Sequence, residues 1–364
     1  LEAGATEALA DLVDADTQGF DPLTLRVIGG LLPSFEVEDR VELELLGGDR
    51  LGGRVGGGSG EQLYLELPGA AVLSLAIDSF TALVFDGRIP EDPGVPIEPA
   101  EAGDRLYRRV ADRLDRVDGT IEGFSAEGVR FDGLIGSQLY PWDELAALFV
   151  EPLVDPEPLR FEPRAITVDL VDGSRLRGHV ESLTAEEIRF EVLPSGDPVR
   201  LPWSVIGLVS SADGRLEWLG QRVPSKAVDA APFGDDLGMV WPHRVDRCVD
   251  GGPLQVDGQR YSRGLGVHAP SRLEWVFERG GTLRGAVAID ASTELLAWRG
   301  SVVFRVEVDG ESRWRSAVVR GGDAPLRLPG IEVADGSTVA LVVEEADAAH
   351  LGDRANWLML RLAR

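Results

Sequence analysis

The chain has 364 residues, of which 44% are hydrophobic, and its formal net charge is −26. This length exceeds one ordinary hydrophobic core and predicts two to four domains. The negative charge excludes nucleic acid and anionic membrane as favourable partners, because both would be repelled. No apolar run approaches the roughly 20 residues that a membrane-spanning helix requires, so we predict no membrane span.

Turn-forming residues are abundant, with 44 glycines and 22 prolines. This composition is typical of many short strands joined by turns, and it predicts an all-β fold. The single cysteine, Cys248, excludes an internal disulfide framework. The chain starts at Leu1 without a leader-like segment, a start that a processed protein and a trimmed chain would share.

A repeated pattern runs through residues 25–212. V-E-L-E-L-L-G-G-D-R-L-G-G-R-V at residues 41–55 lies over I-T-V-D-L-V-D-G-S-R-L-R-G-H-V at residues 166–180, with a constant offset of 125. The same offset carries residues 79–84 onto residues 204–209. A third copy lies between them, where F-S-A-E-G-V-R-F at residues 124–131 matches L-T-A-E-E-I-R-F at residues 183–190. We therefore predict three copies of one unit.

The start of the middle copy has two readings. Its apolar residues at the spacing of one helix face would allow an amphipathic helix over residues 104–118. The alignment with the other copies instead requires a strand, a turn near Ala111 and Asp112, and a second strand. We follow the alignment and predict two strands.

Each copy predicts five short strands with tight turns, which is typical of small Sm-like or SH3-like barrels. We assign residues 1–24 to an N-terminal extension and residues 25–90, 103–152 and 163–212 to three barrels. Some Sm-like barrels bind RNA through basic loops and stacking aromatics. Acidic residues dominate here, and Trp142 and Trp203 occupy alignable positions suited to packing, so we expect the barrels to be structural.

The last part of the chain changes to longer alternating strands. We expect strands at residues 272–277, 283–289, 301–308, 313–319, 338–344 and 356–362, and an Asp309-Gly310 hairpin turn. Strands with one apolar face each predict an antiparallel β-sandwich over residues 225–364.

Motifs in this region resemble a known family. They are Y-S-R-G-L-G-V-H-A-P-S-R-L-E-W-V-F at residues 261–277, G-A-V-A-I-D at 285–290, G-S-V-V-F-R-V-E-V-D-G at 300–310 and G-D-R-A-N-W at 352–357. In this order they look like the NPCBM/NEW2 domain, the same group as carbohydrate-binding module family fifty-one. The resemblance implies a galactose-binding-like sandwich of a bacterial protein that is secreted, periplasmic or on the cell surface. It also implies a galactose-type glycan as the ligand.

The stretch at residues 353–357 departs from the family pattern. Members often carry a D-H-A-D-W-like motif, whereas this chain has D-R-A-N-W. Arg354 replaces the histidine and Asn356 replaces the second acidic residue, which changes the hydrogen-bonding groups that the stretch offers.

Sugar binding requires an aromatic ring for the apolar face of a pyranose, with donors and acceptors for its hydroxyls. Trp298 and Arg299 are candidates because their loop has no strand face for a tryptophan to occupy, although Trp298 could instead cap the sandwich. His268 could bind a hydroxyl or be satisfied by a backbone carbonyl. Candidates at the final strand entry, any of which could equally be structural, are Asp353, Asn356 and Trp357.

Sandwiches of this type often hold a structural calcium through carboxylates, and Asp290 and Asp347 are the candidate ligands. We expect no other cofactor. The sequence lacks the nucleophile, metalloprotease and phosphate-loop motifs of common enzymes, and we expect no catalytic activity.

Two functions from different classes remain open, besides a third, an accessory module of a separate hydrolase. The first is a non-catalytic, exported carbohydrate-binding protein in which the barrels present the sandwich. The alternative is a structural or scaffold protein of a cell envelope or multi-subunit assembly, in which the sandwich contacts a protein partner. Both allow a homo-oligomer, which would strengthen a weak single site by multivalency.

Overall fold

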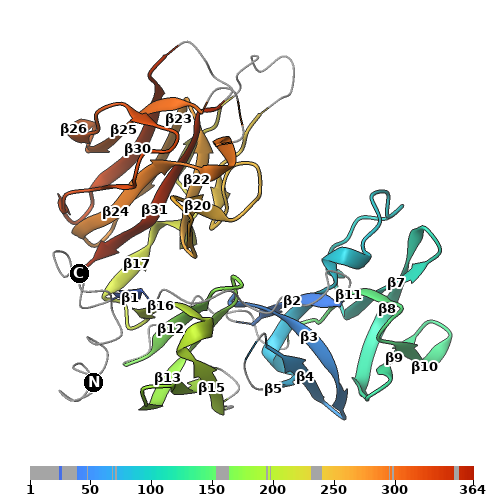
Figure 1. The fold of residues 1–364 in the computed structure, drawn as a ribbon. Coiled ribbons are helices and arrows are strands. Elements are labelled where there is room, and N and C mark those ends of the chain that lie inside the picture. Colours follow the sequence, from blue (N-terminus) through green and yellow to red (C-terminus); the bar gives the residue numbers. More distant parts are fainter. Residues whose placement is uncertain are drawn as a thin grey trace. The chain divides into compact units, whose positions relative to one another are not determined.

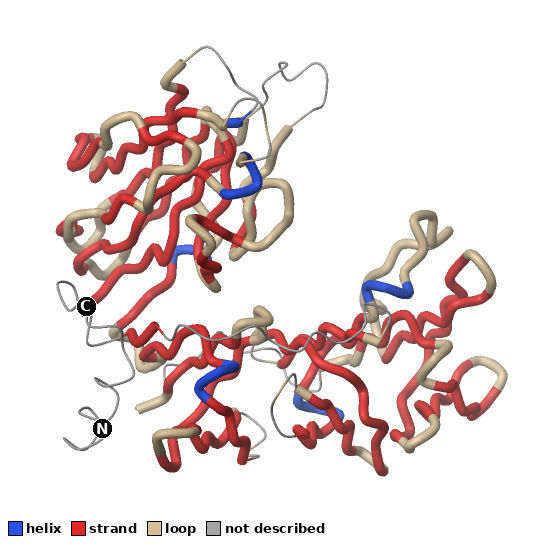
Figure 2. Tube along the Cα trace, viewed as in Figure 1, coloured by secondary structure: helices blue, strands red, loops and turns tan. Residues whose placement is uncertain are grey.

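The structure, a computed structural model, describes residues 24–26, 39–46, 48–67, 69, 72–152, 164–193, 196, 198–230, 240–294, 296, 299–347 and 352–364. The chain divides into two compact units, Leu1–Asp213 and Gly214–Arg364. The described elements of both are β-strands joined by turns and short 3-10 helices, as predicted (Figures 1 and 2). In these ranges no helix has the length and hydropathy to cross a membrane.

The first unit contains three successive sets of five strands, here called copies 1, 2 and 3. Copy 1 consists of β2 (Arg40–Leu45), β3 (Arg50–Ser59), β4 (Gln62–Glu66), β5 (Val72–Ala76) and β6 (Phe80–Val84). Copy 2 consists of β7 (Asp104–Val110), β8 (Arg113–Phe124), β9 (Gly128–Gly133), β10 (Gly136–Pro141) and β11 (Leu145–Phe149). Copy 3 consists of β12 (Ile166–Leu170), β13 (Arg175–Leu183), β14 (Glu187–Val192), β15 (Pro198–Pro202) and β16 (Ile206–Ser211). The 3-10 helices of this unit are η1 (Ile77–Ser79), η2 (Asp86–Arg88) and η3 (Trp203–Val205).

All three copies have the same strand order. In each, the fifth strand pairs with the first, and the second, third and fourth follow in sequence. The pairing of first and fifth strands carries one irregularity at the same place in every copy, where one residue of the fifth strand is skipped. A shared order and a shared bulge fit one repeated unit, because a bulge fixes how a strand bends.

The register corrects one detail of the sequence alignment. Residues 41–55 correspond to residues 166–180 at the predicted offset, but η1 aligns with η3 one residue further on. In the fifth strands, Phe80 corresponds to Ile206, since each pairs with the last residue of its copy's first strand. Copy 3 therefore has one more residue than copy 1 between the start of its third strand and the end of its fourth. The predicted match of residues 79–84 with residues 204–209 was wrong by one position.

The opening of copy 2 is a hairpin, which confirms the two predicted strands over residues 104–118. β7 and β8 pair continuously from Asp104↔Gly119 to Val110↔Arg113. Ala111 takes a positive φ of 53° in the turn between them. The apolar spacing that also suited a helix arises because both faces of the hairpin are packed: Leu106 and Leu114 are buried on opposite faces.

The fifth strands also join copies together. β6 pairs with β11, so copies 1 and 2 form a single ten-stranded sheet. β16 of copy 3 pairs instead with β1 (Thr24–Arg26), so the third sheet has six strands. Two of the three residues of β1 fall inside the range predicted for the first barrel, yet they pair with copy 3.

The second unit is a sandwich of two antiparallel sheets. One sheet has the order β19-β22-β31-β24-β28, with β17 and β29 pairing beside it; the other has the order β18-β23-β30-β25-β26, with β27 beside it. The strands of the first sheet are β17 (Leu216–Trp218), β19 (Arg244–Val245), β22 (Gly264–His268), β24 (Gly281–Ile289), β28 (Leu326–Arg327), β29 (Ile331–Val333) and β31 (Arg354–Ala363). Those of the second are β18 (Lys226–Val228), β23 (Ser271–Val276), β25 (Ser301–Val308), β26 (Glu311–Arg315), β27 (Val319–Arg320) and β30 (Thr338–Glu345). A separate hairpin, β20 (Leu254–Val256) with β21 (Gln259–Tyr261), and two 3-10 helices, η4 (Leu219–Gln221) and η6 (Ala291–Thr293), complete the described elements.

The predicted hairpin in this unit is confirmed, but the strand after it is shorter than predicted. Asp309 and Gly310 take positive φ values of 53° and 79° between β25 and β26. The chain leaves the sheet after Arg315, because the backbone N–H of Phe304 donates to the Ser316 hydroxyl at 2.9 Å instead of to a carbonyl. One predicted strand over residues 313–319 is therefore two, β26 and β27.

Candidate functional site

One end of the sandwich gathers most of the predicted site residues. β22 ends at His268 opposite Arg354, where β31 begins, and the next strand of that sheet, β24, ends beside them at Ile289. The Ala269 N–H donates to the Asp353 carbonyl at 3.0 Å just before β23 starts the second sheet. We call this end, formed by the residues that flank His268, Asp290, Ser301 and Arg354, the His268 rim.

An aromatic residue that the sequence did not single out lies on the His268 rim. Trp241 is half-buried, and its ring centroid lies 4.8 Å from that of His268 at an interplanar angle of 49°. The guanidinium carbon of Arg354 lies 5.8 Å from the Trp241 ring centroid. Trp241 thus combines a partly exposed ring with a cation over that ring, and an exposed aromatic surface is the group that contacts the apolar face of a pyranose.

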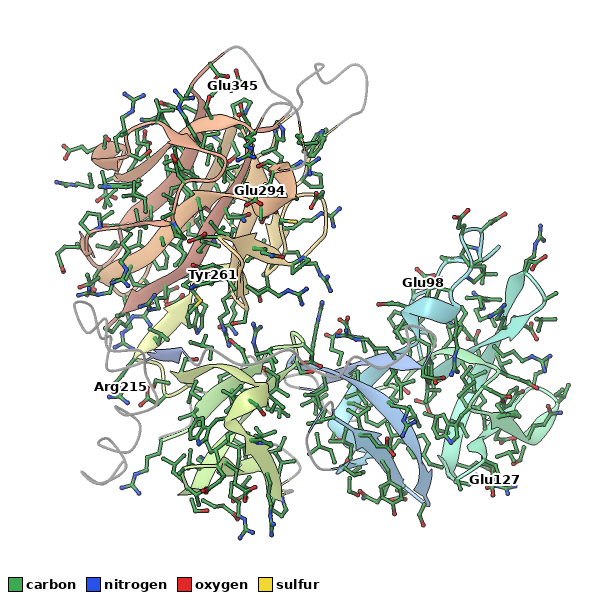
Figure 3. The ribbon with its side chains drawn as sticks, in the orientation of Figure 1. Glu98, Glu127, Arg215, Tyr261, Glu294 and Glu345 are labelled. Atoms are coloured by element: carbon green, nitrogen blue, oxygen red, sulfur yellow. The ribbon has the colours of Figure 1, made fainter. Side chains whose placement is uncertain are left out.

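Arg354 connects this aromatic residue to a hollow in the surface. Its Nη1 donates to Asp250 Oδ2 at 2.6 Å and to the Ser292 hydroxyl at 3.2 Å. Asp250 and Ser292 line an open hollow of about 650 Å³, together with Cys248, Gly252, Pro253, Gln255, Asp290, Ala291 and Glu294. Glu294, labelled in Figure 3, is exposed at its edge. Its lining includes three carboxylates and one hydroxyl, whose oxygens can accept hydrogen bonds from sugar hydroxyls.

Asp290 forms the floor of the hollow. It is 2% exposed and caps η6, accepting hydrogen bonds from the N–H of Ser292 at 2.9 Å and of Gln255 at 3.1 Å. Asn356, which is fully buried, donates to it through Nδ2 at 2.6 Å. Asn356 therefore holds Asp290 from beneath and does not reach the surface.

Asp353 ties the two sheets together at the rim. It is fully buried and accepts the Ser301 N–H at 2.8 Å, while the Ser301 hydroxyl donates to Asp347. Arg299 is exposed close by. Trp298, the aromatic residue that the sequence favoured as the sugar platform, lies outside the described residues.

Two predicted site residues are buried. Trp357 has no exposed surface and packs edge-on against Phe304, with ring centroids 5.1 Å apart. His268 is 2% exposed, with Nδ1 2.7 Å from the Ala269 carbonyl. Of the roles left open by the sequence, the structure gives Trp357 a place in the core and gives His268 a backbone carbonyl as partner.

The two carboxylates named for calcium do not form a site with each other. Asp290 is committed to three hydrogen bonds, and the side chain of Asp347 is 52% exposed and engaged with Ser301. Within the described ranges no group of three or more acidic, histidine or cysteine side chains is placed to hold a metal ion. A structural calcium bound through other donors stays a prediction.

Cys248 lies beneath Asp250 and is 1% exposed. Burial is the main reason that its thiol pKa rises to about 12, and its hydrogen bond to Asp250 and the nearby Asp290 charge add to the effect. Burial alone would raise the pKa of Asp250, but the Cys248 hydrogen bond and the Arg354 charge outweigh it, so that pKa lies below its usual value. At neutral pH the pair is a neutral thiol donating to a carboxylate.

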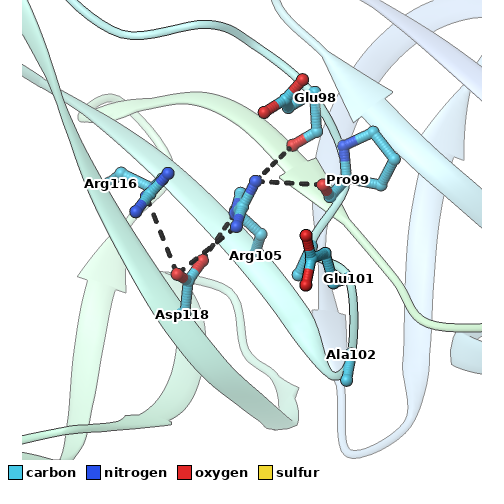
Figure 4. A pocket seen from close by; sticks show the side chains of 8 residues that line it. Glu98, Pro99, Glu101, Ala102, Arg105, Arg116 and Asp118 are labelled. Atoms are coloured by element: carbon cyan, nitrogen blue, oxygen red, sulfur yellow. Dashed lines mark hydrogen bonds and ion pairs between the residues drawn. The ribbon is translucent and has the colours of Figure 1, made fainter.

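A second hollow, of about 620 Å³, lies in copy 2 beside residues 88–102, a proline-rich connector between copies 1 and 2 (Figure 4). Arg105 is buried there and donates to the Glu98 and Pro99 carbonyls at 3.2 and 3.0 Å and to Asp118 at 2.6 Å. Its hydrogen bond is the main cause that lowers the pKa of Asp118. These contacts fasten the connector to β7 and β8, so we assign this hollow a structural role.

The residues around Trp241 were missed because they lie between predicted strands. Trp241 follows a connecting segment in which apolar and polar residues do not alternate, and Asp250 lies in a turn. Hydrophobic periodicity therefore gave no signal for either residue. The reasoning applied to Trp298, that a tryptophan without a strand face invites a binding role, would have found Trp241.

Comparison with known proteins places the second unit in a domain class. Residues 227–363 match the family model described as the NPCBM/NEW2 domain. A search of curated proteins finds no match.

Solved structures similar to this chain include carbohydrate-binding modules of family 51. One, from a family 95 glycoside hydrolase of Clostridium perfringens in complex with methyl-galactose, is 19% identical, covers 41% of this chain and 99% of its own, and has a TM-score of 0.35. A tandem pair from a family 98 glycoside hydrolase of Streptococcus pneumoniae is 14% identical, with coverages of 71% and 88% and a TM-score of 0.33. A structure of the second such module with INT domains from Clostridium perfringens ZmpB, in complex with GlcNAc, is 20% identical with a TM-score of 0.37; the match covers 54% of this chain and 43% of that one. From the motifs and the family model together, residues 227–363 form an NPCBM/NEW2 domain.

Proposed function

We propose that this protein is a non-catalytic carbohydrate-binding protein that acts outside the cytoplasm and binds a galactose-type glycan at the His268 rim. The observation that carries the proposal is the group formed by Trp241, Arg354 and Asp250 beside the open hollow. It supplies an aromatic face, a cation and carboxylate oxygens in one place, within a domain of a carbohydrate-binding class.

The binding groups are held in position before a ligand arrives. Arg354 is fixed by Asp250 and Ser292, and Asp290 is fixed by Asn356 and two backbone N–H groups. A sugar would therefore meet an ordered surface and immobilise few side chains, which lowers the entropic cost of binding. A single shallow site of this kind predicts affinity in the roughly millimolar to micromolar range.

The first prediction is that Trp241→Ala weakens glycan binding by about tenfold or more, because the stacking face is lost and a factor of ten corresponds to ~1.4 kcal/mol. A glycan array of the full-length protein would identify the ligand, and calorimetry would compare the variant with the parent.

Trp314→Ala is the matched control, since Trp314 is also half-buried in the sandwich but lies on β26 away from the rim. Equal losses in the two variants would count against a site at Trp241. No binding by the parent protein to a broad array would count against the function itself.

A scaffold function is the second candidate, and the pairing of the copies favours it. β6 and β11 show that the repeated unit can join a neighbour edge to edge. Co-purification of a defined protein partner, without glycan binding, would support this candidate over the first.

A further inference from the structure

The outer edge of the fifth strand accepts a partner in all three copies. In copies 1 and 2 the partner is the fifth strand of the other copy, and in copy 3 it is β1. Each pairing is antiparallel and covers three residues. The repeated unit therefore carries a pairing edge as a constant feature.

The shared bulge fixes which positions correspond between copies. After the skipped residue, the fifth strands continue at Ala82, Ala147 and Leu208, each opposite the equivalent residue of its own first strand. The next positions are then Leu83, Leu148 and Val209. We call the second set the central positions.

The pairing between copies 1 and 2 is symmetric about the central positions. Leu83 lies opposite Leu148, and the flanking pairs are Ala82↔Phe149 and Val84↔Ala147. Each flanking pair joins the position before the centre in one copy to the position after it in the other. The edge is thus self-complementary, as a two-fold interface requires.

β1 uses the same three positions of copy 3. Leu25 lies opposite the central Val209, with Thr24↔Ser210 and Arg26↔Leu208 on either side. β1 therefore takes the place that a fifth strand of another copy would take, although it belongs to no five-stranded set.

We propose that the β16 edge is a docking site for β16 of a second copy of this protein, and that β1 occupies this edge and blocks the pairing. When β1 leaves, two β16 strands pair antiparallel about Val209, with Leu208 opposite Ser210 of the partner molecule. The two sheets, each reduced to five strands by the loss of β1, then join into one ten-stranded sheet. The N-terminal segment thereby sets whether the protein is a monomer or a dimer.

A variant without β1 pairing tests the proposal. Successive N–H groups of a strand point to opposite sides, so either residue 25 or residue 26 directs its N–H toward β16. Proline lacks this N–H, so the double variant Leu25→Pro, Arg26→Pro removes the donor in either case. By size-exclusion chromatography with light scattering, we expect the parent chain at its monomer mass of 39.2 kDa and the double variant at twice that mass. A double variant that stays monomeric at every concentration tested would overturn the proposal.

A cysteine at the centre of symmetry reports the contact directly. Residues directly opposite in antiparallel strands have Cα atoms about 4.5–5.5 Å apart, within disulfide range. We expect Val209→Cys to give a disulfide-linked dimer under mild oxidation in the double-proline background and not with β1 intact. The natural Cys248 does not compete, because it is buried with a pKa of about 12.

Val180→Cys in the same background is the control, since Val180 is also partly buried against the same core but lies on β13. Equal cross-linking through residues 180 and 209, or through residue 209 with β1 intact, would contradict the proposal. A synthetic peptide of residues 20–30 should return the double variant to monomer by restoring β1 in trans. These readouts are independent of glycan binding, so they can fail or succeed separately from the proposed function.

Discussion

At the scale of single residues, the rim is held by hydrogen bonds to buried carboxylates. Asp290 and Asp353 are both almost without exposed surface and accept backbone N–H groups. A buried carboxylate is stable only when its oxygens are satisfied in this way. The sequence named Asp290 as a candidate calcium ligand and Asp353 as a candidate for sugar binding or for a structural role. It could not show that the two lie at one end of the sandwich, because residue identity alone does not reveal which distant segments a fold brings together.

Cys248 offers a direct test of the geometry under the hollow. Its pKa of about 12, against an ordinary 9.0, makes the thiolate fraction at pH 8 about a thousandfold smaller than for an exposed thiol. We expect a thiol reagent to modify folded Cys248 at least a hundredfold more slowly than the cysteine of a Val245→Cys variant, whose site is 46% exposed. Equal rates at the two sites would show that Cys248 is not enclosed.

At the scale of elements, glycine decides where strands can approach closely. A Cβ on Gly178 would lie 1.8 Å from the Glu191 carbonyl oxygen across the β13–β14 pair, whereas one on Gly207 in β16 would meet nothing nearer than 3.5 Å. We expect Gly178→Ala to lower the free energy of unfolding of the first unit by about 2 kcal/mol or more, as overpacking does.

Gly207→Ala is the matched substitution in the same copy, with an expected change within about 0.5 kcal/mol. Denaturant unfolding monitored by tryptophan fluorescence would compare the two variants with the parent chain. Equal effects would mean that the close approach of β13 and β14 is not what requires glycine.

The elements that the sequence predicted best were those with strong turn signals. Asp309 and Gly310 fixed the β25–β26 hairpin, and the alignment fixed the turn at Ala111. The break after Arg315 was missed because it depends on the Ser316 hydroxyl meeting the Phe304 N–H, a contact between two strands. The pairing of β1 with β16 was missed for the same reason, since register between distant segments leaves no local pattern.

At the scale of the whole molecule, repulsion between charges and the hydrogen bonds of ionised carboxylates have opposite effects on stability as the pH falls. The net charge of −26 destabilises the folded chain by self-repulsion, which partial protonation relieves. Asp118, Asp250 and Asp309 have pKa values lowered from 3.8, so their contributions are present above pH 3.8 and are lost as the pH falls through the lowered values.

We therefore expect the melting temperature to rise from pH 7 to about pH 5 and then to fall steeply below pH 3.8. Thermal unfolding in a pH series at constant ionic strength would check this. A melting temperature that keeps rising down to pH 3 would show that repulsion outweighs the carboxylate contacts.

Odd and even numbers of repeats have different consequences for a chain whose units join in pairs. With three units, one pairing edge has no partner unit in the same chain. A short strand that takes the place of the absent unit covers that edge within a single polypeptide. A relative with four such units would need no additional strand. A relative with three units and no strand equivalent to β1 would be an obligate dimer.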